Sequence, residues 1–501
     1  MGNNGANIKS WQDYNAKKKH AVFGTASLGY KDFVYLDLTG RNDWSSSLPA
    51  SNRSYFYYSV GTSFVLTEVF KKIPKKVLSY AKLRASYASV GNDAGFDQLL
   101  DGLKYGNTYL GNMSYFESDN RKRNARLKPE STVSWEVGAD LRFWDGRASV
   151  DFTYYDKTTR DQIVNAEIDG ISGYSNAVMN AGKVRNWGTE LTVGVIPVRV
   201  KDFEWKLDFN WAKNNSKILE LNNGADFMKL GSAQIADIRL VVGHSFGSIF
   251  SGDAMRDENG NILVDNEGRR YEEKGVFLGD VSPKWMGGIR TSFRWRDISA
   301  SVLFDIKVGG KVWSATAYQG TRGGLTTQSL EGRDDYWFSK WVLNESDTER
   351  TGYLQPQHTA NGQGADHLYW DKDRPKGIQI PNAIYYGGVH AGQNSEAWLS
   401  PETYFRHDIG KNGSLFLYDA SYVKLREVSI GYNLPGKILK KIGFLQSMKI
   451  SAVGRNLAIL HQNTPDGVDP EATSSMGSAQ GIENGFSLPT ATYGFELKVT
   501  F

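Results

Sequence analysis

The segment Gly243-His-Ser-Phe-Gly247 has the clearest spacing for covalent chemistry in this sequence. It matches the pattern G-x-S-x-G, in which a nucleophilic serine occupies a sharp turn between a strand and a helix. Arg239-Leu-Val-Val242 can form the strand, but Ser248-Ile-Phe-Ser-Gly-Asp253 has the pattern of a strand or loop, not a helix. A soluble β-rich hydrolase is therefore only our third hypothesis, and we predict that the protein is not an enzyme.

Metal or cofactor ligands are the second kind of chemistry to consider. Asp257-Glu-Asn-Gly-Asn261 and Asp265-Asn-Glu-Gly268 are rich in oxygen ligands, but both lack the complete spacing of a calcium loop with its distal Glu. Asx-Gly pairs are typical of turns. The seven His form no compact ligand pair, and the absence of Cys excludes thiolate metal sites and disulfides. We expect no cofactor, with a loop calcium ion as the alternative.

Charge and hydropathy exclude two further classes of protein. The 59 basic and 55 acidic residues give a net charge of +4, which is no signature of nucleic-acid binding. No run of about 18 apolar residues is present, so a transmembrane helix is excluded. A membrane β-barrel remains compatible with this composition, because its strands have about ten residues and are only half apolar.

Apolar and polar residues alternate along much of the chain, up to its last residue. Such alternation predicts strands with one apolar and one polar face. In the final segment we expect the apolar face to contact lipid and to act as the signal that the barrel-assembly machinery recognises. The residues of this predicted signal are Tyr493, Phe495, Leu497, Val499 and Phe501.

Short polar connections alternate with long connections between these strands. Short turns at one end and long loops at the other are typical of outer-membrane barrels. We therefore predict an all-β fold, a transmembrane antiparallel β-barrel with long extracellular loops near residues 91–131, 215–282, 309–420 and 461–489. The predicted strands are residues 20–30, 33–41, 54–66, 79–90, 132–144, 147–159, 186–199, 203–214, 284–296, 298–308, 421–434, 447–460 and 490–501.

The odd number of strands predicts an incomplete barrel. Closed bacterial barrels have an even number, which puts both chain ends in the periplasm. Thirteen strands would start outside the cell, with residues 1–19 as an extracellular loop remnant, and would leave two sheet edges open. Alternatively, one strand is missing from the count, and residues 237–250 are the best candidate for it. The apolar residues also change parity near Arg426-Glu427, which predicts a β-bulge.

The predicted loop 309–420 is rich in Trp, Tyr, Gly and Asn. Aromatic faces stack on sugar rings and pack at protein interfaces. We expect this loop to contact a substrate or a partner protein, because loops of such length without a function are uncommon. The alternative is that its aromatic residues only pack the loop against itself. The candidate residues are Trp337, Trp341, Tyr385 and Tyr386.

Several segments resemble those of the SusC/RagA-type TonB-dependent transporters of Bacteroidetes. Residues 127–140 resemble the family phrase KPE-x-x-x-SWE-x-G-x-D, and residues 421–435 resemble its segment SY-x-(R/K)-L … GY-x-LP. The resemblance extends from about residue 20 to residue 501 in the order of the family. Further matching segments are residues 151–157, 180–190, 279–285, 454–457 and 469–471.

The resemblance implies a fold and a set of partners. The family fold is a barrel of 22 strands filled by an amino-terminal plug domain, and a SusD-like surface lipoprotein covers it. Such transporters import oligosaccharides or peptides with energy from TonB–ExbB–ExbD, which acts through the plug. The thirteen strands predicted here correspond to the back part of that barrel, and we find no plug domain and no signal sequence in the chain.

We therefore expect residues 20–501 to form the C-terminal β-barrel fragment of a SusC-like importer. The expected location is the outer membrane of a Gram-negative cell of the Bacteroidetes type. The expected partners are a SusD-like lipoprotein, TonB–ExbB–ExbD through a plug missing from this chain, the barrel-assembly machinery and outer-membrane lipid. The alternative function is a passive outer-membrane pore or adhesin without TonB coupling.

Overall fold

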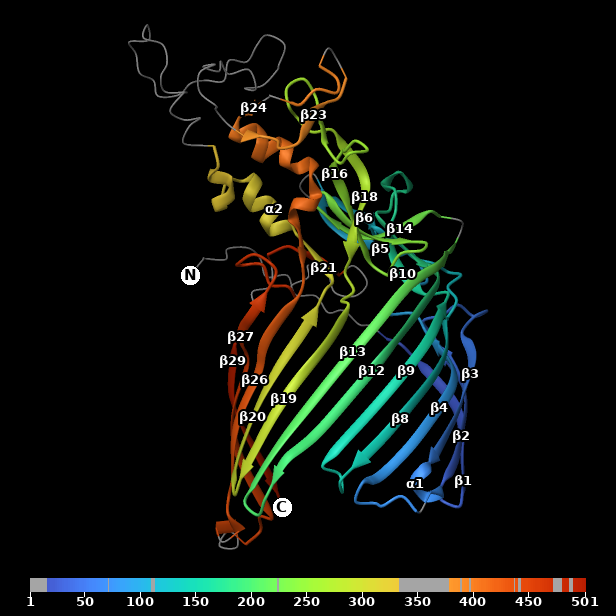
Figure 1. The fold of residues 1–501 in the computed structure, drawn as a ribbon. Coiled ribbons are helices and arrows are strands. Elements are labelled where there is room, and N and C mark those ends of the chain that lie inside the picture. The colour runs from blue at the N-terminus through green and yellow to red at the C-terminus, as the bar shows by residue number, and fades with distance from the viewer. Residues whose placement is uncertain are drawn as a thin grey trace. The chain divides into compact units, whose positions relative to one another are not determined.

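The fold was described from a computed structural model of the chain. It describes residues 16–70, 72–109, 113–222, 225–332, 378–387, 390–395, 398–436, 438–439, 443–471, 480–485 and 490–501. Most of this part of the chain is β-strand (Figure 1). No helix in these ranges is long and apolar enough to cross a membrane.

The largest sheet has thirteen strands in chain order, and neighbouring strands pair antiparallel, as in β1 with β2 and β19 with β20. This confirms the predicted antiparallel fold and the predicted strand number. β1 and β29 stand at the two ends of the strand order, so the described strands form an incomplete barrel, as predicted. The strands are β1 (Lys19–Tyr30), β2 (Val34–Ser45), β3 (Ser54–Val65), β4 (Leu78–Asn92), β8 (Glu130–Phe143), β9 (Ala148–Arg160), β12 (Gly182–Arg199), β13 (Phe203–Leu221), β19 (Trp285–Trp295), β20 (Ile298–Val308), β26 (Tyr422–Asn433), β27 (Ser447–Gln462) and β29 (Thr492–Thr500).

A second sheet of seven strands lies in the connections between the predicted strands. The alternative of a fourteenth spanning strand at residues 237–250 is wrong, because β15 and β16 form a hairpin of this second sheet there. Alternation is absent from β16 because both of its faces are buried, as at Ile249 and Phe250. In sheet order the strands are β18 (Glu272–Asp280), β16 (Ser248–Ala254), β15 (Ala236–Val241), β14 (Phe227–Ala233), β10 (Ile163–Glu167), β11 (Asn176–Asn180) and β7 (Arg121–Lys122).

Smaller elements complete the loop segments. A three-stranded sheet joins β25 (Leu417–Asp419), β21 (Lys311–Ser314) and β28 (Ile482–Glu483). The strand pairs are β5 (Leu103–Tyr109) with β6 (Met113–Ser118), β17 (Ile262–Val264) with β23 (Ala383–Tyr385), and β22 (Ile378–Gln379) with β24 (Trp398–Leu399). The helices and helical turns are α1 (Leu66–Val69), α2 (Ala315–Arg322), η1 (Gly170–Ser172), η3 (Thr327–Leu330), η5 (Thr403–Asp408), η6 (Ile409–Lys411) and η7 (Gly413–Phe416).

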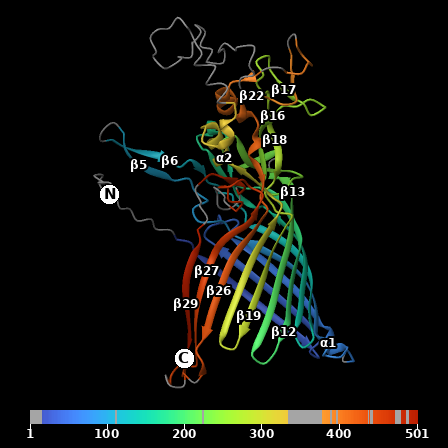
Figure 2. The ribbon, with the colours of Figure 1, turned by 60° about the vertical axis from the view of Figure 1, so that its left-hand side comes forward.

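The chain divides into two compact units. Unit 1 comprises Met1–Leu191 and Ser216–Met228, and unit 2 comprises Thr192–Asn215 and Lys229–Phe501. Within unit 2, β26, β27 and β29 run side by side (Figure 2).

The short turns have the backbone conformation that tight hairpins need. Lys31 and Asp32, between β1 and β2, have φ values of 48° and 58°, which is the left-handed conformation of a type I′ turn.

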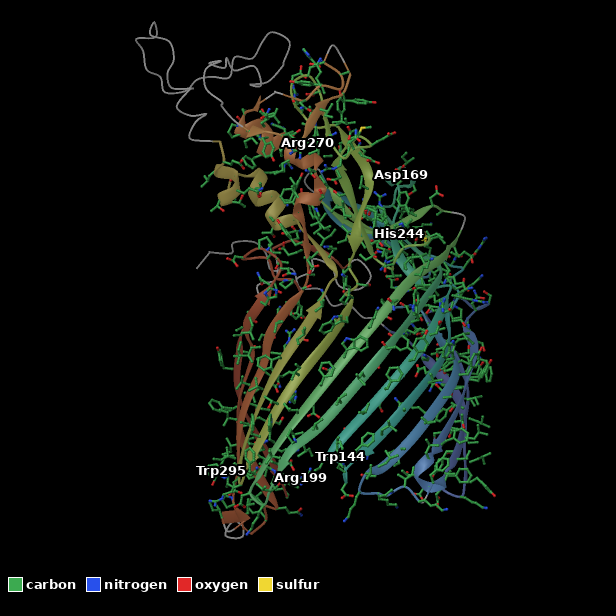
Figure 3. The ribbon with its side chains drawn as sticks, in the orientation of Figure 1. Trp144, Asp169, Arg199, His244, Arg270 and Trp295 are labelled. Carbon is green, nitrogen blue, oxygen red and sulfur yellow. The ribbon has the colours of Figure 1, made fainter. Side chains whose placement is uncertain are left out.

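Trp144 follows β8 and Trp295 ends β19, each at the short-turn end of its own hairpin (Figure 3). Their exposed fractions are 57% and 56%. Exposed tryptophans at strand ends are typical of the aromatic girdle at a membrane interface.

Candidate functional site

The strands of unit 2 have an apolar face and a polar face, which the register defines. Trp205 of β13 lies opposite Phe293 of β19, on the face where large apolar side chains are exposed. On the other face Asp208 lies opposite Arg290. The predicted apolar and polar faces are therefore present on these strands in the folded chain.

A β-bulge places two consecutive charged residues on the polar face of β26. Against β20, the register shifts where Leu303 and Phe304 lie opposite Glu427 and Leu425. Arg426 is the extra residue, and its side chain binds Asp305 on the polar face. The bulge predicted near Arg426-Glu427 is therefore confirmed.

A cluster of charged side chains lies at the loop-side end of β20 and β26. We call it the carboxylate clamp and define it as Asp305, Lys424, Arg426, Asp469 and Glu471. Lys424 Nζ donates to Asp469 Oδ1 at 2.8 Å and to Glu471 Oε2 at 2.5 Å. Arg426 Nη2 donates to Glu471 Oε1 at 2.7 Å and also binds Asp305 Oδ2. Because Asp469 and Glu471 follow β27, the clamp fastens the connection between β27 and β29 to the polar face.

Burial and hydrogen bonding explain why the clamp remains charged. Lys424 is 4% exposed, and such a cation is tolerated only with close counterions. Burial alone raises the pKa of Glu471, but the hydrogen bonds from Arg426, Lys424 and Tyr422 outweigh it and lower the pKa to about 2. The Tyr422 hydroxyl lies 2.8 Å from Glu471 Oε1. Glu471 is therefore ionised at neutral pH and holds Lys424 and Arg426 as a carboxylate.

We expect acid to release this fastening between about pH 4.5 and pH 2. The pKa of Glu471 falls from 4.5 to about 2 on folding, so its contribution to stability is complete above pH 4.5 and is lost as the pH falls toward 2. The measurement is cleavage of residues 463–471 by pepsin at pH 4.5 and pH 3. Wild type should become more susceptible at the lower pH relative to Glu471→Gln, which lacks the titrating group. An equal ratio at both pH values would contradict the expectation.

A comparable cluster lies at the loop-side end of β1, β2 and β3 in unit 1. Asp43 is 0% exposed and accepts hydrogen bonds from three groups. Arg41 Nε lies 2.6 Å from Asp43 Oδ1, and Lys19 Nζ lies 2.9 Å from Oδ2. The Tyr57 hydroxyl donates to the same Oδ2 at 3.1 Å. One buried carboxylate therefore ties the ends of three strands together on their polar face.

A buried ion pair organises the loop elements of unit 2. Arg270, labelled in Figure 3, donates its backbone N–H to Asp408 Oδ1 at 2.8 Å, and its guanidinium pairs with Asp408 Oδ2. The guanidinium also lies 5.0 Å from the ring centroid of Tyr404. This pair joins the segment before β18 to the helical turn η5.

Comparison with known proteins now assigns the family. Residues 1–343 match the family model described as TonB dependent receptor-like, beta-barrel. The chain belongs to this family. As a TonB-dependent receptor barrel it lies in the outer membrane, with its apolar face toward lipid and its polar face toward the lumen.

Three similar proteins support the assignment. TonB-dependent receptor P26 of Formosa agariphila is 24% identical over 98% of this chain and 47% of its own length. TonB-dependent receptor SusC of Bacteroides thetaiotaomicron is 25% identical over 72% of this chain and 39% of its own length. A solved structure of the RagAB peptide transporter shares the fold with a TM-score of 0.65 at 18% identity, over 97% of this chain and 48% of the other. The chain thus spans less than half the length of these relatives.

The aromatic candidates for ligand contact are only partly described by the structure. Trp337 and Trp341 lie outside the described residues of this TonB-dependent receptor barrel. Tyr385 is partly buried against a cluster of apolar residues that includes Ile262 and Leu399. Tyr386 is 53% exposed, and its ring lies edge-on to Tyr271 at 5.4 Å. Contact of Tyr386 with a ligand or partner stays a prediction.

The predicted barrel-assembly signal lies on β29. Its residues from Tyr493 to Val499 lie in register with the apolar face of β27, for example Leu497 opposite Ile450. The exposed fractions of Tyr493, Phe495 and Leu497 range from 60% to 89%. Their role in assembly stays a prediction, but their position at the outer face of an end strand is compatible with it.

The two other candidate chemistries have structural explanations. Gly243–Gly247 forms the turn between β15 and β16, and the strand that follows cannot supply the helix of a nucleophile elbow. Asp257 Oδ1 accepts from the N–H groups of Asn259 and Asn261, as expected for an Asx turn. Within the described ranges, no group of three His, Asp or Glu side chains is arranged to hold a metal ion. A loop calcium ion stays an untested alternative.

The sequence did not single out the carboxylate clamp. Lys424, Arg426 and Asp469–Glu471 occurred only inside segments that resemble the family. A signal was present, since the parity change at Arg426-Glu427 puts two charges on one face. The partner carboxylates could not be found from it, because Asp469 lies 45 residues after Lys424.

Proposed function

We propose that the chain is the C-terminal barrel part of a SusC-like, TonB-dependent importer of oligosaccharides or peptides. The supporting observation is a sheet with an apolar outer face and a charged inner face, on a chain that the receptor family model matches. The proposal includes a SusD-like lipoprotein at the loop side and TonB–ExbB–ExbD acting through a plug. The RagAB neighbour is named a peptide transporter, while the charged lumen face suits glycans and peptides equally.

The lumen side chains suggest how cargo passes. Several charges on this face are neutralised by a neighbour, as in Lys206–Asp208 at 2.7 Å and Arg455–Glu427 at 3.0 Å. Paired charges keep the lumen surface hydrated, but they bind a passing polar molecule only weakly. Weak binding suits passage, because the molecule must be released after it enters. The carboxylate clamp keeps the connection after β27 fixed at the mouth during this passage.

The test is uptake by the source bacterium with and without the coding sequence of this chain. We expect uptake of a labelled oligosaccharide or peptide to be lost in the deletion strain and in wild type treated with a protonophore. Restoring the gene should restore uptake, which is the control for indirect effects of the deletion.

The passive pore or adhesin is the second candidate and predicts a different result. The purified protein would show constitutive conductance in planar bilayers, and uptake would continue when the protonophore collapses the proton gradient. This pair of observations would rule out the coupled importer.

A further inference from the structure

Lys307 is a lumen-face residue that the carboxylate clamp does not neutralise. It is the penultimate residue of β20 and lies in register with Met286 of β19 and Tyr422 of β26. Asp305, two residues earlier on the same strand, points to the same face. Lys307 therefore lies at the loop-side mouth of the lumen, next to the clamp.

The polar face of β20 and β26 contains three cations, and their pairing differs. Lys424 and Arg426 each have two carboxylate partners. Lys307 makes no hydrogen bond or ion pair with any residue that the structure describes, although it is partly buried. An unpaired, partly desolvated charge is costly, and such a residue in a lumen is a candidate for function.

The charged groups that act electrostatically on Lys307 are already engaged by other partners. They are Glu471, Lys424, Asp419 and Asp469. Glu471 and Asp469 bind the cations of the clamp. Asp419 Oδ1 accepts from the backbone N–H of Ser421 at 2.9 Å, and its Oδ2 lies 3.8 Å from Lys311 Nζ. Each of these three carboxylates therefore already has another partner.

We propose that Lys307 binds a carboxylate group of the cargo at the mouth of the lumen. The proposal rests on the importer function proposed above and adds the chemical class of the cargo. The clamp's own cations pair with Glu471 and Asp469, so the ammonium group of Lys307 stays available. An ammonium group is a compact point charge that accepts a ligand from several directions, which suits a molecule that moves past it. The carboxylate can come from a uronic-acid unit or from an acidic peptide.

The experiment measures binding to the purified outer-membrane protein by calorimetry at low ionic strength. The probes are trigalacturonate with neutral galactotriose as its control, and triglutamate with triglutamine as its control. We expect one charged probe to bind more tightly than its neutral control, and this identifies the source of the carboxylate. Lys307→Met should weaken binding of that probe about tenfold, which is ~1.4 kcal/mol, and leave the neutral control unchanged. Lys307→Arg should retain most of the affinity.

Lys206→Met is the matched control, because Lys206 is also a lumen-face lysine but is paired with Asp208. The affinity of the Lys206→Met variant for the charged probe should stay near that of wild type. High salt should abolish the difference between wild type and Lys307→Met, since it screens the charge.

Two results would overturn the proposal. One is an equal loss for charged and neutral probes in Lys307→Met, which would indicate a structural role. The other is a wild type that binds neither charged probe more tightly than its neutral control. Binding through Lys307 without protonophore-sensitive uptake would instead contradict the importer function alone, so the two failures are distinguishable.

Discussion

Replacing Asp43 by alanine is expected to lower the free energy of unfolding by about 3 kcal/mol. The change removes the acceptor for Lys19, Arg41 and Tyr57 on the polar face of unit 1. It leaves two cations close together without their counterion. The cations are about a third exposed, so water compensates part of the loss and keeps it at the lower end for a broken buried ion pair. The measurement is the temperature at which the folded band converts to the unfolded band on unheated and heated gels.

Asp37→Ala is the matched control for this substitution. Asp37 lies on the same strand and the same face, but it is exposed, and its described bond is one from the Ser27 hydroxyl at 2.5 Å. We expect a change of less than about 1 kcal/mol for it. Equal transition temperatures for the two variants would show that the Asp43 cluster does not stabilise the strand ends.

Replacing Phe501 and Phe495 together by glutamine is expected to reduce the amount of protein in the outer membrane by roughly tenfold, because unassembled chains are degraded. The phenylalanines belong to the predicted assembly signal, and Phe495 is 89% exposed on the apolar face of β29. We expect polar side chains there to weaken contact with lipid and the predicted recognition by the assembly machinery. The measurement is quantitative immunoblotting of outer-membrane fractions.

Lys498→Gln is the control on the same strand. Lys498 lies on the other face of β29, opposite Lys449 of β27, and it is not part of the apolar set. We expect normal amounts of this variant in the outer membrane. If the double phenylalanine variant also assembles normally, the signal assigned to β29 is incorrect.

The strands of the large sheet could be predicted from sequence because their pattern has a local cause. Lipid on one side and water on the other impose alternation residue by residue, as in the terminal segment and in β20. The same reasoning failed for β15 and β16. In β16 adjacent residues such as Ile249 and Phe250 are both buried, so no polar residue marks a face, whereas the alternation of β15 extends over only six residues.

The candidate site was predictable only in part, because its contacts join distant residues. The change in parity of the apolar residues located the bulge at Arg426. No nearby sequence pattern indicated its contact with Asp305, which is 121 residues away. The unpaired state of Lys307 depends on which carboxylates its neighbours occupy, and this is a property of the folded network. By contrast, the aromatic candidates came from composition alone, and composition does not separate Tyr385, which packs in a core, from the exposed Tyr386.

The bulge at Arg426 also determines where this strand tolerates a change in length. Leu425 faces lipid and Glu427 faces the lumen, with Arg426 as the surplus residue between them. Deletion of Arg426 would leave strict alternation, so the side chains before and after it would still point to the same sides of the sheet as before. Loss of a codon within the regular part of β26 would instead turn every later side chain to the wrong side. Related genes can therefore gain or lose a residue here while the rest of the strand keeps its orientation.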